Sequence, residues 1–277
     1  MTTCLRNFLR TIFSVTMTNI LLTISYDGTD FCGWQRQDKA AEGQPVRTIQ
    51  GEIEHALEKM FRCHINVYGS GRTDSGVHAA GQAANFLSPV DSIPEKNYVR
   101  ALNGLLPHDI RIMDACKVSD DFNARFNATS RMYRYFIHAE SVPLAKDTRY
   151  VWCIPNRPDV DRLNEMCSFL HGELDCATFA AAGDQSLSTK RFIDSARFFV
   201  DSSDKDMLVF EIEANAFLWR MIRSLTGTLI QCEQKGKSAL HFKEILDSCD
   251  RRRALMTAPP NGLFLWKIRF DGIRRHV

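Results

Sequence analysis

Gly69–His78 reads GSGRTDSGVH and joins two stretches, Ile65–Tyr68 and Gln82–Leu87, whose composition predicts strands. Its three glycines can adopt backbone angles that other residues avoid, so the loop can bend sharply and approach another group closely. One carboxylate, Asp74, and one guanidinium, Arg72, lie inside it. Taken alone, this pattern also fits a plain turn in which Asp74 bonds to its own backbone.

Three well-known glycine motifs do not fit this chain. Gly69–Gly71 begins like a dinucleotide-binding fingerprint, but Asp74 stands where the third glycine is needed. Gly28–Gly33 has the first six positions of a phosphate-binding loop, but Trp34 replaces the required lysine. No GxSxG surrounds the serines of the loop, so a hydrolase elbow is unsupported. No cofactor is therefore predicted.

The rest of the chain predicts strands and helices in two similar halves. Many links between strands are short, which favours antiparallel pairing. The fold class is therefore α+β, with two similar halves sharing a mostly antiparallel mixed sheet flanked by helices. The seam lies near Ala124–Arg131, so we expect an N-terminal half at residues 19–125 and a C-terminal half at residues 126–277. Strands are predicted at 20–25, 65–68, 82–87, 110–118, 132–138, 196–200, 207–213 and 263–270, and helices at 49–61, 94–106, 160–170, 217–231 and 240–246.

The composition is that of an ordinary globular protein, with 44% hydrophobic and 25% charged residues. No apolar run approaches the roughly 20 residues that a membrane span needs, so a soluble protein is expected. The nine cysteines form no CxxC pair, which argues against zinc ribbons and disulfide frameworks and fits the reducing cytoplasm. The eight histidines form no HExxH, so no metal site is predicted.

Positive charge is concentrated toward the C-terminus. The net charge is only +2, but Trp219–Val277 holds twelve Lys and Arg against five Asp and Glu. Such a segment can attract a polyanion such as RNA, although many solvated surfaces have the same composition.

The first eighteen residues lack acidic groups and carry Arg6 and Arg10. A targeting peptide is one interpretation. We favour a dispensable or wrongly assigned extension with Met17 as the true start, because the apolar stretches are short and no cleavage site is evident. Residues 1–18 are therefore expected to be disordered or not native.

Residues 71–79, GRTDSGVHA, resemble the signature of the TruA family of tRNA pseudouridine synthases. The resemblance extends over nearly the whole chain after residue 18. The other segments that resemble motifs of this family are, in chain order, 26–28, 33–37, the position of Gln50, 121–126, 131–135, 215–218, 221–223 and 262–265.

The resemblance implies a pseudouridine synthase fold and a set of catalytic residues. Asp74 is the implied nucleophile or base, paired with Arg223, which keeps the carboxylate ionised. Tyr133 is implied to stack on the uracil and to handle the proton that leaves C5. Without the resemblance, we would interpret Tyr133 as an aromatic residue of the core or the sheet face, and Arg223 as a polar residue of an amphipathic helix.

The family also implies how the RNA is held. Arg72 takes part in displacing the flipped nucleotide, Leu263 lines the uracil pocket, and Arg125 and Arg131 contact phosphates. Members act on uridines 38, 39 and 40 of the tRNA anticodon arm, work as homodimers and use no cofactor. These properties are expectations for this chain.

Three departures from the family pattern are visible. Ser75 stands where alanine is more common, Leu218–Arg220 fills a variable stretch, and the loop at residues 37–47 is longer than in the shortest members. The RNA contacts of that loop are therefore open.

Two other hypotheses remain. The scaffold could bind RNA without catalysis, which the presence of Arg72, Asp74, Tyr133 and Arg223 argues against. An Asp-dependent nucleoside hydrolase is the other, and it would release free uracil.

Overall fold

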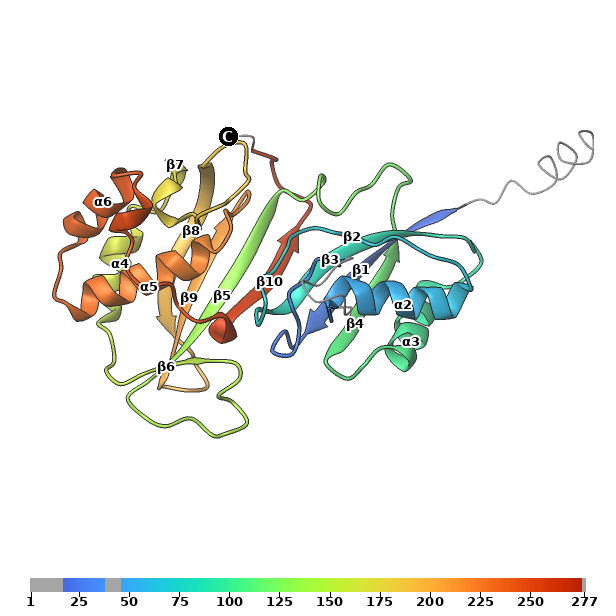
Figure 1. Cartoon of the computed structure of the whole chain (residues 1–277), viewed down its shortest axis with the longest axis horizontal. Helices are drawn as coiled ribbons and strands as arrows, with labels where there is room; N and C mark the ends of the chain where they lie inside the picture. Colours follow the sequence, from blue (N-terminus) through green and yellow to red (C-terminus); the bar gives the residue numbers. More distant parts are fainter. Residues whose placement is uncertain (1–16, 38–45, 276–277) are drawn as a thin grey trace, which may run out of the picture.

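A single mixed sheet runs through the protein, with helices beside it (Figure 1). The computed structural model describes residues 17–37 and 46–275, and these form ten strands. Eight strands follow in the order β4-β1-β3-β10-β5-β9-β8-β7, while β2 pairs with β3 and β6 pairs with β5. Only the β10–β3 and β5–β6 pairs are parallel among the described residues. The predicted fold class, a mostly antiparallel mixed sheet flanked by helices, is confirmed.

The elements have the following bounds. The strands are β1 (Thr18–Tyr26), β2 (Tyr68–Gly69), β3 (His78–Ser88), β4 (Ile110–Lys117), β5 (Ser130–Ala139), β6 (Trp152–Ile154), β7 (Gly172–Asp175), β8 (Lys190–Val200), β9 (Met207–Ala214) and β10 (Leu263–Arg269). The helices are α2 (Ile49–Phe61), α3 (Glu95–Leu105), α4 (Val160–Cys167), α5 (Met221–Gln234) and α6 (Ala239–Asp247). Within the two described ranges, none of them combines the length and apolarity of a membrane-crossing helix.

Alternating apolar residues explain why β1 and α2 form where they do. Ile20, Leu22 and Ile24 alternate along β1 and are fully buried. Ile53 and Leu57 recur at helical spacing in α2 and are also fully buried. Thr48, directly before α2, is its N-cap residue, and its hydroxyl accepts from a backbone N–H of the first turn.

Several predicted elements differ in extent from the structure: β3 begins at His78 and not at residue 82, and β8 begins at Lys190 and not at residue 196. Of the predicted strand 65–68, only Tyr68 pairs with β3, because the Val67 backbone bonds instead to Glu54 and Gln50 of α2. The predicted helix at 217–231 begins at Met221, since the Met221 N–H bonds to the Leu218 carbonyl over 3.1 Å and closes a turn directly before the helix. The short strands β6 and β7 were not predicted, because three or four residues carry too little periodicity.

The last strand, β10, lies between strands of the two predicted halves. Phe264 pairs with His78 of β3, and Leu263 pairs with Tyr135 of β5. Leu265 of β10 is fully buried. The C-terminal end of the chain therefore closes the centre of the sheet, and the colours of Figure 1 show it as the red strand between green and teal.

The predicted boundaries stay predictions. The first strand begins at Thr18, and residues 1–16 of the predicted extension lie outside the described residues. Residues 38–45 of the predicted 37–47 loop also lie outside them. The division between residues 125 and 126 falls in the connection between β4 and β5.

Gly81→Ala should destabilise the protein where β3 meets β10. A Cβ at Gly81 would lie 2.5 Å from the Trp266 backbone oxygen, which cannot move aside without shifting the strand. We expect a loss of about 1–3 kcal/mol in the free energy of unfolding, measured by urea denaturation. Gly104→Ala in α3 is the matched control, since its Cβ would meet nothing within 4 Å. It should leave stability unchanged or raise it by up to about 1 kcal/mol. Equal stability of the two variants would contradict this account.

Candidate active site

The loop that holds Asp74 is fixed by bonds to neighbouring segments. The Trp34 backbone N–H donates to the Thr73 carbonyl over 3.1 Å, and the hydroxyls of Tyr26 and Thr73 lie 2.8 Å apart. The Gln82 amide donates to the Gly71 carbonyl over 2.7 Å. These bonds come from both sides of the loop, so Asp74 sits on a rigid support.

A glycine outside the loop permits this close packing. Gly33 has a φ of 87°, and a Cβ there would lie 2.6 Å from the Thr73 carbonyl oxygen. A side chain at Gly33 would therefore displace the loop. Within the loop itself, Gly76 alone has a positive φ, at 76°.

Two donors hold the Asp74 carboxylate, and both come from the C-terminal half. Arg223 Nη1 lies 3.2 Å from Asp74 Oδ2, and Trp219 Nε1 donates to Asp74 Oδ1 over 3.0 Å. Arg223 is itself held by Ala258, whose carbonyl accepts from Arg223 Nε over 2.8 Å. The side chains of Asp74 and Arg223 are 20% and 13% exposed, so the pair is partly shielded from solvent yet open on one side.

Tyr133 lies beside this loop on β5. It is buried, and its hydroxyl would lie 3.8 Å from a Cβ built at Gly71. The ring of Phe217 packs edge-on against it, with centroids 5.2 Å apart. Burial raises the pKa of the Tyr133 phenol, the charge of Asp74 adds to this, and Arg131 opposes it. Tyr133 is therefore a neutral phenol next to the carboxylate.

Arg72 is exposed. Its Nε donates to the Gln35 side-chain oxygen over 3.1 Å, and Gln35 in turn donates to Gln50 of α2 over 2.6 Å. Gln35, Gln50 and Arg72 thus form one connected polar network. Such an exposed guanidinium is free to meet a phosphate or a base.

Arg131 and Arg125 have different surroundings. Arg131 donates to backbone carbonyls of Asn215, Arg125 and Ser70 over 2.7, 2.9 and 3.2 Å. Burial lowers the pKa of Arg131, although its guanidinium stays charged. These internal hydrogen bonds already give the Arg131 side chain a structural role, whereas the Arg125 side chain is exposed. A phosphate contact is therefore easier to reconcile with Arg125 than with Arg131.

Leu263 is 5% exposed at the start of β10 and pairs with Tyr135. Leu265, two residues on, shares its face of the strand and lies 4.0 Å from a Cβ built at Gly71. Leu265 is therefore the β10 leucine nearer to the loop.

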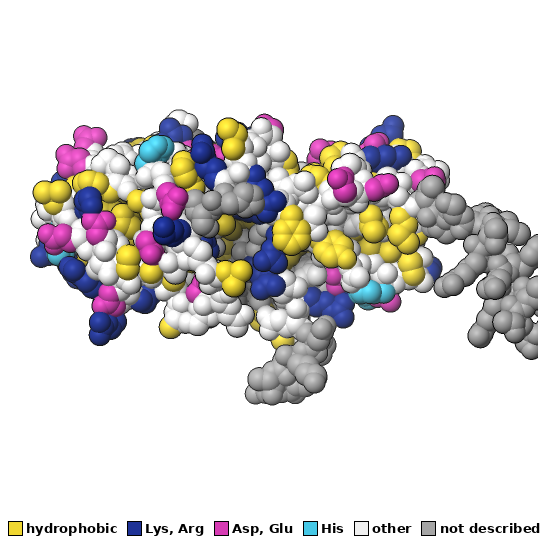
Figure 2. All heavy atoms as spheres, turned by 90° about the horizontal axis from the view of Figure 1, so that it is seen from above, with side chains coloured by type: hydrophobic (Ala, Val, Ile, Leu, Met, Phe, Trp, Pro, Cys, Tyr) yellow, Lys and Arg dark blue, Asp and Glu magenta, His cyan; other side chains and the backbone are white. Residues whose placement is uncertain are grey.

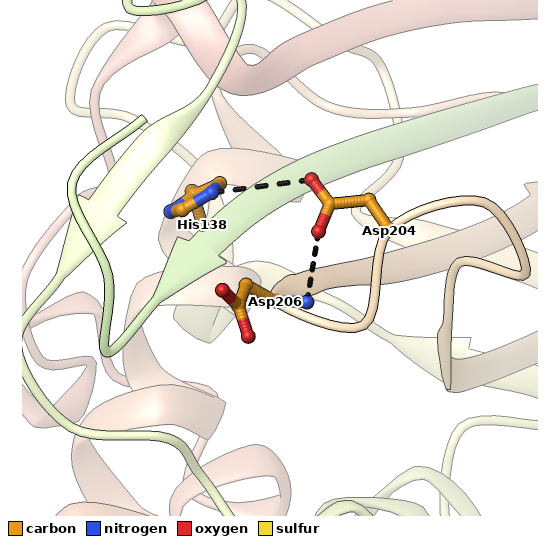
Figure 3. A group of neighbouring side chains, drawn as sticks. All are labelled: His138, Asp204 and Asp206. Atoms are coloured by element: carbon orange, nitrogen blue, oxygen red, sulfur yellow. Dashed lines mark hydrogen bonds and ion pairs between the residues drawn. The ribbon is translucent and has the colours of Figure 1, made fainter. Parts of the chain in front are cut away.

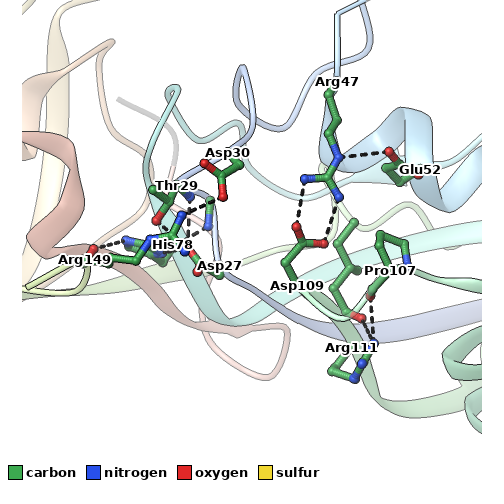
Figure 4. Close-up of polar contacts among 12 residues, drawn as sticks. Asp27, Thr29, Asp30, Arg47, Glu52, His78, Pro107, Asp109, Arg111 and Arg149 are labelled. Atoms are coloured by element: carbon green, nitrogen blue, oxygen red, sulfur yellow. Dashed lines mark hydrogen bonds and ion pairs between the residues drawn. The ribbon is translucent and has the colours of Figure 1, made fainter. Parts of the chain in front are cut away.

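His78 is the last residue of the loop and ties it to the C-terminal half (Figure 4). It is fully buried, its Nδ1 accepts from the Gly28 backbone N–H over 3.0 Å, and its Nε2 lies 3.1 Å from the Arg149 carbonyl. Both contacts are satisfied by a neutral ring with its proton on Nε2. Asp27 Oδ1 lies 3.2 Å from Nδ1 and favours protonation, but burial has the larger effect and lowers the pKa of His78.

One cluster in the described ranges has the composition of a metal site. Ligand atoms of His138, Asp204 and Asp206 lie within 4.8 Å of one another (Figure 3). Asp206 already accepts from the Ser141 hydroxyl over 2.7 Å, and Asp204 accepts from the Asp206 backbone N–H over 2.9 Å. Each of the two carboxylates therefore already accepts a hydrogen bond from the protein, and no metal ion is needed to explain why they lie together.

A cavity of about 450 Å³ lies beside His138 and Asp204, and Asp74 is not among the residues that line it.

Trp219 was missed by sequence reasoning. Its only sequence signal was its position four residues before Arg223, which one turn of helix would bring to the same face. The structure achieves the same result with a turn, because Arg220 adopts a left-handed φ of 57° directly before α5. The two side chains then converge on Asp74.

Basic side chains gather near the middle of one face. Figure 2 shows Lys and Arg there, with Asp and Glu mainly toward the two ends of the molecule. A surface of this kind suits a polyanion.

A family model described as tRNA pseudouridine synthase matches residues 22–127 and 166–271. The chain is 54% identical over 252 residues to tRNA pseudouridine synthase A of Treponema denticola, covering 91% of this chain and 92% of the relative. This chain belongs to the tRNA pseudouridine synthase family. The predicted family and the predicted enzyme class, an isomerase, are confirmed.

Other members of the family are similar over most of their length. The proteins of the same name from Treponema pallidum and Brachyspira hyodysenteriae are 49% and 40% identical, over 87% and 90% of this chain and 84% and 96% of theirs. A protein in the crystal structure of an archaeal box H/ACA sRNP complex is 12% identical, with a TM-score of 0.32 over 76% of this chain and 42% of its own. That likeness is too distant to support any conclusion.

His78 should make stability fall in mild acid. Its pKa in the folded protein is below the ordinary value of 6.5, so the unfolded chain binds the proton more readily. Stability from the neutral ring is fully present above about pH 6.5 and is lost as the pH falls below it. In urea denaturation between pH 7.5 and 5, His78→Gln should lose less stability than the wild type. His55→Gln, at an exposed position of α2, is the control and should follow the wild type. Parallel curves for all three proteins would refute this role of burial.

Arg131→Ala and Arg125→Ala should differ in what they damage. Loss of Arg131 leaves three carbonyls without their donor, so the melting temperature should fall, by an amount equivalent to about 2 kcal/mol or more. Loss of the exposed Arg125 should leave melting unchanged and weaken tRNA binding, with a smaller salt dependence. Thermal melting and filter binding at several salt concentrations separate the two. Unchanged melting of Arg131→Ala would show that its internal bonds contribute little.

Proposed function

We propose that this protein converts uridine to pseudouridine at positions 38, 39 and 40 of tRNA, with Asp74 as the catalytic carboxylate. The observation that carries the proposal is the 3.2 Å contact between Asp74, in the family's signature loop, and Arg223 of α5. A nucleophile or base must be a free carboxylate held in a defined position, and the guanidinium of Arg223 supplies the opposite charge beside it. The proposal rests on this arrangement together with membership of the family.

The reaction exchanges one bond of the base for another. The N1–C1′ bond breaks, the uracil turns, and C5 bonds to C1′. The proton lost from C5 is balanced by one gained at N1, so neither oxidant nor group donor is needed. Asp74 acts at the sugar or the ring, either by attack on a carbon or by removal of a sugar proton.

The environment of Tyr133 suits one of its two proposed tasks better than the other. With its pKa raised by burial, the phenol is not available as a base in its resting state. It suits stacking against the uracil, and it can donate its proton within a hydrogen bond. Removal of the C5 proton then needs a second acceptor, and Asp74 is the carboxylate nearest at hand.

Substrate recognition is proposed from the relatives' name and from the charge distribution. A uridine in a helical stem must leave the stack to reach Asp74, which takes a few kcal/mol. Arg72 is proposed to occupy the space of the flipped nucleotide, Leu263 to line the pocket, and Arg125 to contact phosphate, with Arg131 as a weaker candidate. A homodimer that holds one tRNA across both subunits, in the cytoplasm, completes the proposal.

Asp74→Asn and Asp74→Ala should abolish pseudouridine formation and leave tRNA binding intact, because the carboxylate performs chemistry and its loss removes no phosphate contact. The control is Asp247→Asn, the same chemical change at an exposed position of α6. Carbodiimide mapping of tRNA from cells lacking the protein, complemented with each variant, measures modification at each position.

Three outcomes would contradict parts of this proposal. Modification at the wild-type rate by either Asp74 variant would remove Asp74 from the chemistry. Release of free uracil, detected by chromatography, would indicate a hydrolase. Binding of tRNA by the wild type without any modification would indicate an RNA-binding module.

A further inference from the structure

Trp219 contacts the proposed catalytic carboxylate directly. Its Nε1 donates to Asp74 Oδ1 over 3.0 Å, while Arg223 engages Oδ2. Each carboxylate oxygen therefore has its own donor, and the plane of the carboxylate is set by two points. A single ion pair would leave the side chain free to rotate about its last bond.

The backbone of Trp219 is held on both sides. Its N–H donates to the Asp184 carboxylate, and its carbonyl accepts from the Ala181 N–H over 3.0 Å. Burial opposes ionisation of Asp184, but the backbone N–H groups of Trp219 and Ser186 and the hydroxyl of Ser186 lower its pKa overall. The segment at residues 181–186 therefore holds the backbone of Trp219 in place through these two hydrogen bonds.

The indole is 45% exposed, although most tryptophan side chains are largely buried. The guanidinium of Arg220 lies over it, 4.8 Å from the ring centroid. Apolar packing alone gives little reason for the indole to stay in this position. The bond to Asp74, together with the fixed backbone, supplies one.

We propose that Trp219 is a positioning residue that, with Arg223, orients the Asp74 carboxylate toward the uridine. The inference rests on the proposed function, because it assigns Trp219 a role in that reaction. A carboxylate oxygen has more than one lone pair, so Oδ1 can accept from the indole and still face the substrate. Trp219 acts through Asp74 and is assigned no contact with the RNA.

Trp219→Phe removes the donor and keeps an aromatic ring. A hydrogen bond to a charged group is strong, so kcat should fall by about tenfold or more. The KM for tRNA and the melting temperature should stay within about twofold and 2 °C of the wild type, since a missing surface hydrogen bond alters stability little. Trp266→Phe is the matched control, since Trp266 lines the cavity that excludes Asp74.

The kinetic outcomes are distinct. A fall in kcat with constant KM supports the proposal. An unchanged or higher kcat would overturn it and would identify the indole as an obstruction to the substrate. A rise in KM alone would also overturn it and would place Trp219 in RNA binding.

A second measurement tests the contact without activity. The ¹⁵N-indole resonance of Trp219, assigned by its loss in Trp219→Phe, should move upfield in Asp74→Ala as its acceptor is lost. An unmoved resonance would overturn the proposal even if the enzyme is active. Absence of pseudouridine formation by the wild type would instead refute the proposed function, so the two failures can be told apart.

Discussion

The ion pair between Asp74 and Arg223 joins two segments that lie far apart in the sequence. Asp74 belongs to the loop before β3, and Arg223 belongs to the first turn of α5. Neither charged group would be stable in a partly buried position without the other, because an unpaired charge is costly to remove from water. The loop and the helix must therefore be held at a fixed separation, and the surrounding structure does this.

The central strand β10 is one means of holding them. It pairs with β3, which follows the loop, and with β5, which carries Tyr133. A relative shift of the two halves would break these pairings and leave backbone groups unpaired. His78 adds a second connection, since its buried ring bonds to Gly28 on one side and to Arg149 on the other. The loop and its partners are thereby connected across both halves of the sheet.

Several side chains near the site support others. Gln35 and Gln50 connect Arg72 to α2, and Arg131 connects backbone carbonyls of three segments. A residue of a family motif can therefore be present for its internal bonds alone, as the surroundings of Arg131 illustrate. Trp219 is the opposite case, since it was not predicted as a site residue and yet bonds to Asp74.

Local pattern in the sequence determined β1, α2, α3 and most of β5, because alternating or helically spaced apolar residues specify one buried face whatever they pack against. The loop motif also marked Asp74. The tertiary structure alone decided that β10 lies between β3 and β5, that Val67 bonds to α2 instead of extending a strand, and that Trp219 reaches Asp74. These features depend on contacts between residues far apart in the chain, and no local periodicity encodes which distant partner a strand or a side chain will meet.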